Sequence, residues 1–299
     1  MSKMAFVYPG QGVQNPGMGA DFYKESKEAE QIYNEAESIL DFDIKKVCFE
    51  ENDLINNTEY TQAALVTTYL AITGEVIKRE IFPDVTAGLS LGEYGAICVA
   101  GGMNEKEAIS LVRKRGIYMN NAVPEGFGGM TAVLGLNKED IDNVLREKDG
   151  VSVANYNCPG QIVITGSVEA IESSVPDLKK LGAKVRGPFH SPYLKEAGEK
   201  LGRDLEKVTF NNLSIPYVSN VTGEYVDDIK YTKELLKQQV YSPVKWEQSV
   251  RCMIENGVDT FVEIGPGRTI GGFIRKIDKT VRHINISTVE DLKKLDDLR

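Results

Sequence analysis

The amino-acid sequence predicts an α/β fold, in which a large subdomain with a mostly parallel sheet carries an inserted small α+β subdomain. Along most of the 299 residues, short apolar runs alternate with segments of helical spacing. That alternation is typical of a parallel sheet covered by helices on both faces. Between residues 126 and 188 the order of elements changes. We therefore expect residues 1–125 and 189–299 to form the large subdomain and residues 126–188 to form the small one.

The large subdomain is expected to begin with an apolar strand at residues 4–8, which runs into the turn Pro9-Gly10-Gln11-Gly12. Apolar residues then recur at helical spacing, and Pro83 ends one such segment. Helices are expected over residues 18–40, about 60–79, 91–100 and 105–121. After the small subdomain the alternation resumes, with helices near 193–208, 231–240, 246–256 and 269–279 and strands at 216–219, 260–264 and 283–287.

The small subdomain has a different order of elements. Strands are expected at residues 130–134, 151–156, 161–165 and 184–189, and helices at 138–148 and 168–181. The resulting order, β-α-β-β-α-β, is that of a ferredoxin-like fold.

A Gly-x-Ser-x-Gly pattern, Gly88-Leu89-Ser90-Leu91-Gly92, follows the β-branched run at residues 85–87 and precedes a helical segment. A strand, a sharp turn with a central serine and a helix make a nucleophile elbow, so the large subdomain is expected to be hydrolase-like. We expect the Ser90 hydroxyl to stand exposed above the sheet, at a helix N-terminus that stabilises negative charge. In a chain with 28 glycines the pattern alone is weak evidence, and a plain tight turn is the alternative.

A serine hydroxyl needs a base, and the chain has two histidines, His190 and His283. His283 lies in an expected terminal strand, where a structural role is the ordinary explanation. His190 lies in a proline-flanked loop at the seam between the two subdomains, where clefts form. We therefore predict His190 as the general base. The acids between Ser90 and His190 fall in polar helices, which favours a serine–histidine dyad whose tautomer is fixed by a backbone carbonyl or an amide side chain.

The loops at the carboxyl ends of parallel strands form the site in α/β folds. Gln11, just after the first strand, could therefore supply a backbone N–H beside that of Leu91, and together they would form an oxyanion hole. A plain strand-to-helix turn is the alternative for the segment that contains Gln11.

Composition excludes several functions. The formal net charge is −9 and the sequence pI is about 5.0, whereas a nucleic-acid binder needs a concentrated positive surface. No apolar run has membrane-spanning length, and the N-terminus lacks the pattern of a signal peptide, so we expect a cytoplasmic protein without a membrane partner. The four cysteines are scattered singly, without a C-x-x-C pair or a histidine at ligand spacing, and we predict buried free thiols and no metal site.

Six segments together carry a family resemblance that the elbow alone does not. In order along the chain they are Tyr8-Pro9-Gly10-Gln11-Gly12, Gly88-Leu89-Ser90-Leu91-Gly92-Glu93, Arg115-Gly116 with Val123-Pro124-Glu125-Gly126, Asn155-Tyr156-Asn157-Cys158-Pro159-Gly160-Gln161, Gly187-Pro188-Phe189-His190-Ser191 and Glu263-Ile264-Gly265-Pro266-Gly267. With these segments the sequence resembles the malonyl-CoA:acyl carrier protein transacylases of fatty acid and polyketide synthesis. The resemblance extends over nearly the whole chain.

The resemblance implies a ping-pong transfer without a cofactor. Ser90 would take malonyl from malonyl-CoA as an ester, and the phosphopantetheine thiol of acyl carrier protein would take it from Ser90. His190 would act as base and acid. The family's oxyanion hole maps onto the backbone N–H groups of Gln11 and Leu91.

Two further roles come from the resemblance alone. The backbone carbonyl of Gln239 would orient the histidine, and Arg115 would hold the malonyl carboxylate. A guanidinium can form two parallel hydrogen bonds to a carboxylate, which would favour malonyl over acetyl. Without the resemblance, Arg115 would be read as a solvated helix residue.

The chain departs from the family at Leu89, where many members carry histidine, and this makes the shape of the acyl pocket harder to predict. Phe189 before His190 matches the pattern associated with malonyl and not with methylmalonyl. Three alternatives stay open: a trans-acting acyltransferase of polyketide synthesis, a serine hydrolase that uses water as acceptor, and a docking module without chemistry. Intact Ser90, His190 and Arg115 argue against the last.

Overall fold

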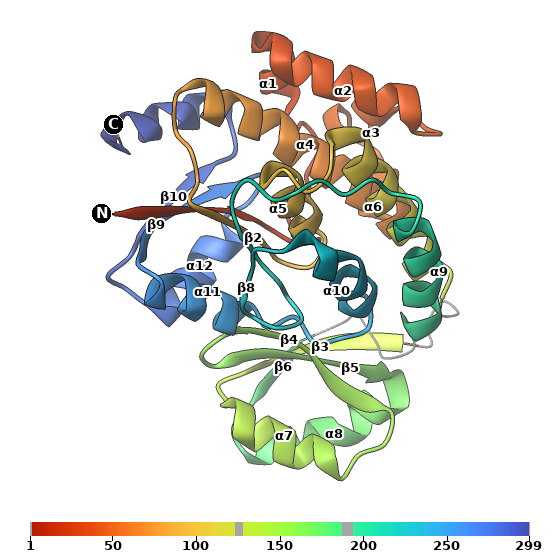
Figure 1. Ribbon diagram of the computed structural model, residues 1–299. Coiled ribbons are helices and arrows are strands. Elements are labelled where there is room, and N and C mark those ends of the chain that lie inside the picture. Colours follow the sequence, from red (N-terminus) through yellow and green to blue (C-terminus); the bar gives the residue numbers. More distant parts are fainter. Residues whose placement is uncertain (1, 123–127, 187–193, 299) are drawn as a thin grey trace.

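The computed structural model describes residues 2–122, 128–186 and 194–298 (Figure 1). It has an α/β body built on a six-stranded sheet and a separate four-stranded antiparallel sheet with two helices. The predicted fold class is confirmed in these terms. Both predicted subdomain boundaries, at residues 126 and 188, lie outside the described residues.

The six-stranded sheet positions the elbow. All of its neighbouring strands are parallel except the last pair. Its strands, in spatial order, are β10 (Arg282–Ile286), β9 (Val258–Ile264), β1 (Lys3–Tyr8), β2 (Val85–Gly88), β7 (Tyr217–Val218) and β8 (Tyr225–Val226). Tyr8 pairs with Gly88, and Val7 pairs with Glu263. The carboxyl ends of β1, β2 and β9 therefore meet at one edge of the sheet.

Helices cover both faces of this sheet (Figure 1). The helices of the α/β body are α1 (Ala20–Glu25), α2 (Lys27–Ile39), α3 (Ile44–Phe49), α4 (Thr58–Lys78), α5 (Gly92–Val99), α6 (Glu105–Asn120), α9 (Lys195–Leu205), α10 (Thr232–Gln239), α11 (Trp246–Glu255) and α12 (Thr269–Ile277). 3-10 helices occupy Leu54–Asn56 (η1), Ile229–Tyr231 (η3) and Val289–Leu298 (η4). Within the part of the chain that the structure describes, no helix is both long and apolar enough to cross a membrane.

Two hydrophobic cores lie on the two faces of the sheet. Because side chains alternate along a strand, Phe6 and Tyr8 of β1 point into the core beneath α4 and α5. Ala5 and Val7 belong to the core that contains Trp246 of α11 and residues of α12. These four side chains of β1 are fully buried, as expected of a central parallel strand.

The helix predicted over residues 18–40 is instead two helices. Ser26 ends α1 and begins α2 in an extended conformation, and its Oγ accepts a hydrogen bond from the Ala29 backbone N–H at 3.1 Å. A serine hydroxyl competes with the helical hydrogen bonds and therefore favours a cap over a helix interior. The short elements α3 and β8 were not predicted. Asp43 caps α3 and was the available signal.

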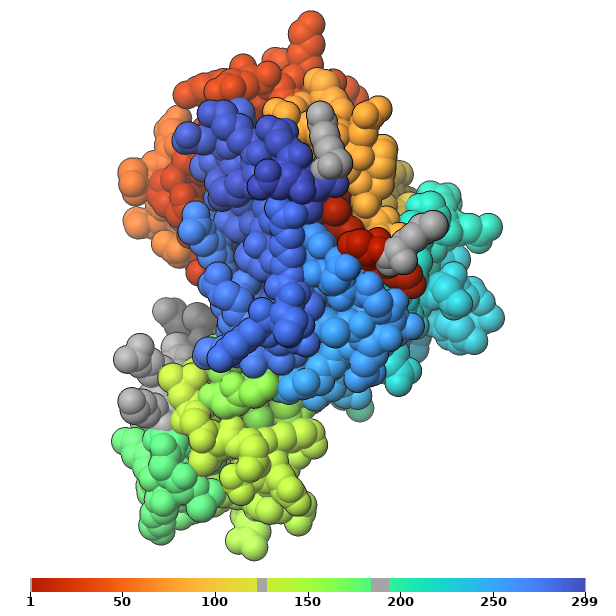
Figure 2. Space-filling view, turned by 90° about the vertical axis from the view of Figure 1, so that its left-hand side faces the viewer, coloured from red at the N-terminus to blue at the C-terminus, as the bar shows by residue number. Residues whose placement is uncertain are grey.

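The four-stranded unit consists of β3 (Gly128–Leu134), α7 (Lys138–Arg146), β4 (Val151–Cys158), β5 (Gln161–Ser167), α8 (Val168–Lys180) and β6 (Lys184–Arg186). Its sheet is antiparallel, in the order β4-β5-β3-β6, and it has its own hydrophobic core. Figure 2 shows this unit, in yellow-green and green, projecting from one end of the molecule.

The four-stranded unit is attached to the α/β body through β4. The Val244 N–H donates to the Ala154 carbonyl at 2.7 Å, and the Tyr156 N–H donates to the Val244 carbonyl at 2.9 Å. Val244 lies between α10 and α11 of the body. These hydrogen bonds bring the segment after α10 against β4, and the candidate site lies beside this junction.

Candidate active site

The elbow has the predicted strand, turn and helix, with Ser90 between the end of β2 and the start of α5. Ser90 has φ of 54°, in the left-handed region that a residue with a Cβ rarely adopts, at a cost of order 1–3 kcal/mol. A Cβ at Gly88 would clash with the backbone of Gly92, and a Cβ at Gly92 would clash with the Tyr8 carbonyl oxygen. Only glycine fits at both positions, and the turn can then pack tightly against β1.

A single buried side chain bridges the elbow from behind. Asn220, just after β7, accepts a hydrogen bond at Oδ1 from the Ser90 N–H and donates one from Nδ2 to the Gly88 carbonyl, both at 2.6 Å. Asn220 is fully buried. It holds the strained residue and the end of β2 together. It was not predicted, although its place after an expected strand at the carboxyl edge of the sheet was an available signal.

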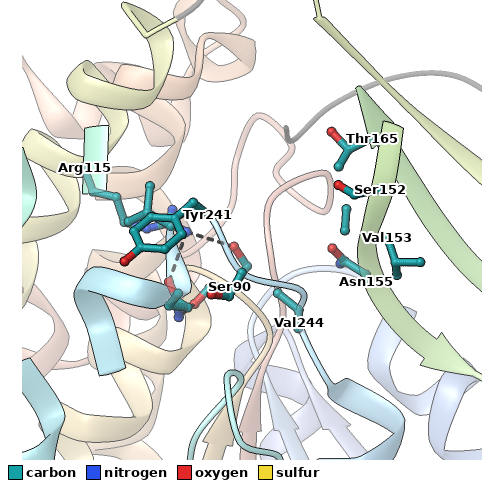
Figure 3. A pocket seen from close by; sticks show the side chains of 12 residues that line it. Ser90, Arg115, Ser152, Val153, Asn155, Thr165, Tyr241 and Val244 are labelled. Carbon is teal, nitrogen blue, oxygen red and sulfur yellow. Dashed lines mark hydrogen bonds between the residues drawn. The ribbon is translucent and has the colours of Figure 1, made fainter. Parts of the chain in front are cut away.

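The prediction that the Ser90 side chain is exposed is wrong, because Ser90 is only 7% exposed. Arg115 of α6 and Gln239 of α10 both contact it. Its Oγ accepts a hydrogen bond from Nη2 of Arg115 at 3.0 Å (Figure 3).

Arg115 of α6 is 2% exposed, whereas a basic helix residue judged without the family resemblance would be expected in solvent. Nη1 donates to Oε1 of Gln62 at 2.7 Å, and Nη2 donates to Oε1 of Gln239 at 3.2 Å as well as to Ser90. The ring of Tyr94 lies 5.7 Å from the guanidinium carbon. Burial lowers the pKa of Arg115, and the nearby Tyr94 and Glu93 oppose that effect.

No carboxylate among the described residues forms an ion pair with this guanidinium. Its hydrogen-bond acceptors are two amide oxygens and one hydroxyl, and its Nε has no partner among the described residues. Neutral acceptors satisfy the donors but leave the buried positive charge uncompensated. The arrangement therefore favours a bound anion beside the Ser90 hydroxyl.

Gln239, the last residue of α10, is 3% exposed and forms hydrogen bonds with three residues of the site. Its Nε2 donates to the Ser90 carbonyl at 2.8 Å and to Oε2 of Glu93 at 2.5 Å, and its Oε1 accepts from Arg115. The role predicted for its backbone carbonyl depends on His190. That histidine lies outside the described residues, so the dyad stays a prediction.

Glu93 and Gln62 were not predicted as site residues. Both are fully buried. Burial raises the pKa of Glu93 from its ordinary 4.5 to about 8, while the hydrogen bond from Gln239 acts in the opposite direction. Gln62 contacts Arg115, and Glu93 contacts Gln239. Both contacts join residues that are far apart in the chain, and helical or strand periodicity does not reveal such contacts.

A pocket opens in front of Ser90, between the α/β body and the four-stranded unit. Figure 3 shows Ser90, Arg115 and Tyr241 on one side and residues of β4 and β5 on the other. The pocket is lined by Ser90, Arg115, Gln239, Val240, Tyr241, Ser242 and Val244 from the body and by Ser152, Val153, Ala154, Asn155 and Thr165 from the small unit. Oδ1 of Asn155 is buried and has no hydrogen-bond partner among the described residues.

The loop after β1 packs directly on the elbow. A Cβ added at Gly10 would lie 2.6 Å from Cδ2 and 3.0 Å from the carbonyl oxygen of Leu89. The Gln11 side chain is tied to Thr58 by a 3.0 Å hydrogen bond. Within the described ranges, no hydrogen bond takes up the backbone N–H of Gln11 or of Leu91.

His283 has other partners. Its Nε2 lies 2.9 Å from Oε2 of Glu263, a fully buried carboxylate that also accepts the backbone N–H groups of Ile270 and Gly271 at the start of α12. The histidine thus ties β10 to β9 and α12, in agreement with a structural role. The four cysteines are free; three are buried, and Cys252 is partly exposed. Among the described residues, no group of histidine, cysteine or acidic side chains could hold a metal ion.

The family model described as "Acyl transferase domain" matches residues 5–292. The chain belongs to the acyl transferase family. A member of this family from Bacillus subtilis (strain 168), named malonyl CoA-acyl carrier protein transacylase, is 40% identical over 304 residues, covering 98% of this chain and 96% of the relative. A protein of the same name from Staphylococcus aureus (strain MRSA252) is 38% identical, with 98% of each chain covered.

Solved structures of acyl transferases superpose closely on this fold. A malonyl CoA-acyl carrier protein transacylase from Clostridium perfringens has a TM-score of 0.96 and 40% identity, covering 100% of this chain and 98% of its own. A malonyl-transacylase, PlMCAT, solved in complex with a type II PKS acyl-carrier protein, has a TM-score of 0.94 and 35% identity, with both chains covered completely.

Proposed function

We propose that this protein transfers the malonyl group of malonyl-CoA to the phosphopantetheine thiol of acyl carrier protein, through an ester on Ser90, for fatty acid biosynthesis. The observation that carries the proposal is the buried Arg115 guanidinium, which donates to Ser90 Oγ and has no carboxylate partner among the described residues. A nucleophile and an uncompensated cation in one pocket suit an acyl group that ends in a carboxylate. The names of the relatives support the same activity.

In the first half-reaction Ser90 Oγ attacks the thioester carbon and loses its proton to His190. The C–S bond breaks, and the CoA thiolate takes the proton that His190 holds. In the second, His190 takes the proton of the carrier thiol, the sulfur attacks the ester carbon, and the proton returns to Ser90 Oγ as the C–O bond breaks. The geometry of His190 lies outside the described residues, so this role rests on the sequence.

The oxyanion formed in both steps needs hydrogen-bond donors. We assign these to the backbone N–H groups of Gln11 and Leu91. Gly10 packs on Leu89, Leu91 directly follows the nucleophile, and no described residue takes up either N–H. The Ser90 N–H is already bound to Asn220 and is not available for this purpose.

Arg115 would select the acyl group. Once Ser90 Oγ is an ester oxygen it is a poorer acceptor, and the malonyl carboxylate would take the guanidinium donor that now faces the hydroxyl. Gln62 and Gln239 would keep the guanidinium in place. An acetyl group would leave the buried cation with one acceptor fewer and no charge partner, which costs free energy.

A polyketide carrier protein as acceptor is the second candidate, because a structural relative was solved with a type II PKS acyl-carrier protein. The chemistry at Ser90 would be the same in both cases. A serine hydrolase would instead release malonate to water without any carrier.

The test is intact-mass analysis of the protein mixed with malonyl-CoA and then with holo acyl carrier protein. We expect one malonyl group on Ser90, none on Ser90→Ala, and transfer of that group to the carrier thiol. An unmodified protein, modification elsewhere, or loss of malonyl to water at the same rate without carrier would overturn the proposal.

We also propose that the enzyme works in the cytoplasm. The support is the free state of all four cysteines, which suits a reducing compartment. The division into a large subdomain, 1–125 with 189–299, and a small one, 126–188, is likewise our proposal, supported by the separate hydrophobic core of the four-stranded unit.

A further inference from the structure

Glu93 is a buried acid that the mechanism above does not use. It lies in the first turn of α5, three residues after the nucleophile, and is fully buried. The charged or titratable groups around it are Arg115, Tyr94 and Tyr217, and no described residue forms an ion pair with it. An acid buried without a paired cation is costly. The hydrogen bonds of its carboxyl group show what it contributes that an apolar residue could not.

The carboxyl group of Glu93 holds two residues that touch the elbow. Its Oε2 accepts from Nε2 of Gln239 at 2.5 Å and from the backbone N–H of Asn220 at 3.3 Å. Gln239 donates to the Ser90 carbonyl, and Asn220 accepts from the Ser90 N–H. Glu93 therefore lies behind the nucleophile as a common anchor of its two supports.

The hydrogen bonds of Gln239 fix which end of its amide faces Arg115. Nε2 has two hydrogens, and both are used, one by Glu93 and one by the Ser90 carbonyl. Oε1 is thereby turned toward Nη2 of Arg115. If the amide rotated by half a turn, its NH₂ group would face the guanidinium and its oxygen would face two acceptors.

We propose that Glu93 is a positioning residue that, through Gln239, holds the Arg115 guanidinium in the orientation that receives the malonyl carboxylate. This inference rests on the proposed function and goes beyond it by naming what sets the acyl selectivity. Gln62 holds Nη1 of the same guanidinium from the other side. Gln62 and Gln239 together fix the plane of the Arg115 guanidinium, and Glu93 fixes the orientation of the Gln239 amide.

What Glu93 supplies is an acceptor, not a charge. Burial raises its pKa to about 8, so the group keeps its proton at neutral pH. Oε1 has no hydrogen-bond partner among the described residues and can carry that proton, while Oε2 accepts in either protonation state. The carbonyl oxygen of a glutamine at position 93 could accept the same two hydrogen bonds.

Two variants of similar side-chain volume distinguish the hydrogen-bond acceptor of Glu93 from its titration. Glu93→Gln keeps the acceptor and loses the titration, and Glu93→Met loses the acceptor. The measurement is kcat/KM for malonyl-CoA and for acetyl-CoA at pH 7. We expect the malonyl-to-acetyl ratio of Glu93→Gln to stay within about threefold of the wild type. In Glu93→Met it should fall about tenfold, mostly through KM for malonyl-CoA, as expected for one lost hydrogen bond to a group that orients a charge.

Adding Glu93→Met to an Arg115→Ala variant tests whether the effect of Glu93 passes through Arg115. If Glu93 acts through Arg115, Glu93→Met will not change the ratio there. A ratio that Glu93→Met leaves intact in the wild-type background, or that falls equally in both backgrounds, overturns the proposal. Should Glu93→Met fail to fold, Glu93→Asp, which withdraws the acceptor by one methylene, must give the same fall in the ratio. If the wild type forms no malonyl-Ser90, the proposed function fails, whereas an unchanged ratio in an active wild type counts only against Glu93.

Discussion

The two sides of the pocket differ in how their polar atoms are used. On the elbow side, Ser90, Asn220 and Gln239 are joined by hydrogen bonds of 2.6–2.8 Å that leave little freedom. On the side of the four-stranded unit, Oδ1 of Asn155 is buried and no described residue bonds to it. The groups that hold the backbone of Ser90 are therefore preorganised before substrate arrives, whereas no described residue holds the amide oxygen of Asn155 on the β4 side.

The largest effect is expected from His190, the predicted general base for Ser90. His190→Ala should lower malonyl transfer by about 10²- to 10⁴-fold, because the hydroxyl loses its general base, while the fold is retained. Stopped-flow transfer assays and circular dichroism would check both parts. His283→Ala is the control, since that side chain is bound to Glu263. Full activity of His190→Ala would return the role of base to His283.

The next effect concerns Asn220, whose side chain bridges the two sides of the elbow turn. Asn220→Ala should lower the free energy of unfolding by about 2–4 kcal/mol, because it removes two hydrogen bonds and leaves the buried Ser90 N–H and Gly88 carbonyl unsatisfied. Urea unfolding gives the value. Asn155→Ala is the matched control, because it deletes an amide whose oxygen has no described partner, and it should cost less than about 1 kcal/mol. Equal losses in the two variants would contradict the contrast between the sides.

Glu93 makes the elbow side sensitive to pH. Its folded-state pKa, about 8, lies above its ordinary 4.5, so between these values the folded protein holds a proton that the unfolded chain releases. The free energy of unfolding therefore falls as pH rises through this window, by up to about 1.4 kcal/mol per pH unit from this group. Glu93→Gln lacks the contribution. Its stability relative to the wild type should rise from pH 5 to pH 8, and a difference that stays constant would show that Glu93 does not titrate this way.

The smallest effect is expected from Asn155, on the β4 side of the pocket. Asn155→Ala should raise KM for malonyl-CoA a few-fold and leave kcat nearly unchanged, because the amide faces the pocket but does not touch Ser90. Steady-state kinetics would check this. Ser152→Ala, at another pocket position on β4, is a useful companion. A large loss of kcat in Asn155→Ala would mean that the small unit takes part in the chemical step.

The sequence predicts local elements better than the contacts between them. The elbow follows from Gly88, Ser90 and Gly92, because the turn itself needs those residues. The break at Ser26 was missed, because the apolar spacing continues through it while the hydroxyl caps the next helix. Four further errors or omissions concern the site. Ser90 was expected to be exposed, and Gln62, Glu93 and Asn220 were not identified.

These omissions have one physical cause. Asn220 lies 130 residues from Ser90, and Glu93 accepts a hydrogen bond from Gln239, 146 residues away. Such contacts depend on the order of strands in the sheet and on which helix covers the elbow, neither of which is written in the spacing of apolar residues. Arg115 illustrates the same limit, because only the family resemblance distinguished it from other basic residues of its helix.

If the uncompensated charge of Arg115 selects malonyl, Arg115→Ala must change malonyl and acetyl transfer differently, and the two rates are to be measured side by side. We expect malonyl transfer to fall roughly 10- to 100-fold, because the variant loses the partner of the malonyl carboxylate. Acetyl transfer should stay level or rise, because an acetyl group no longer leaves a buried guanidinium without a charge partner. Arg113→Ala, two residues earlier on the same helix, is the control; Arg113 already pairs with Asp41 at 2.9 Å, so the ratio should not change. If Arg115→Ala lowers malonyl and acetyl transfer by the same factor, Arg115 does not select the substrate, which contradicts the proposed role.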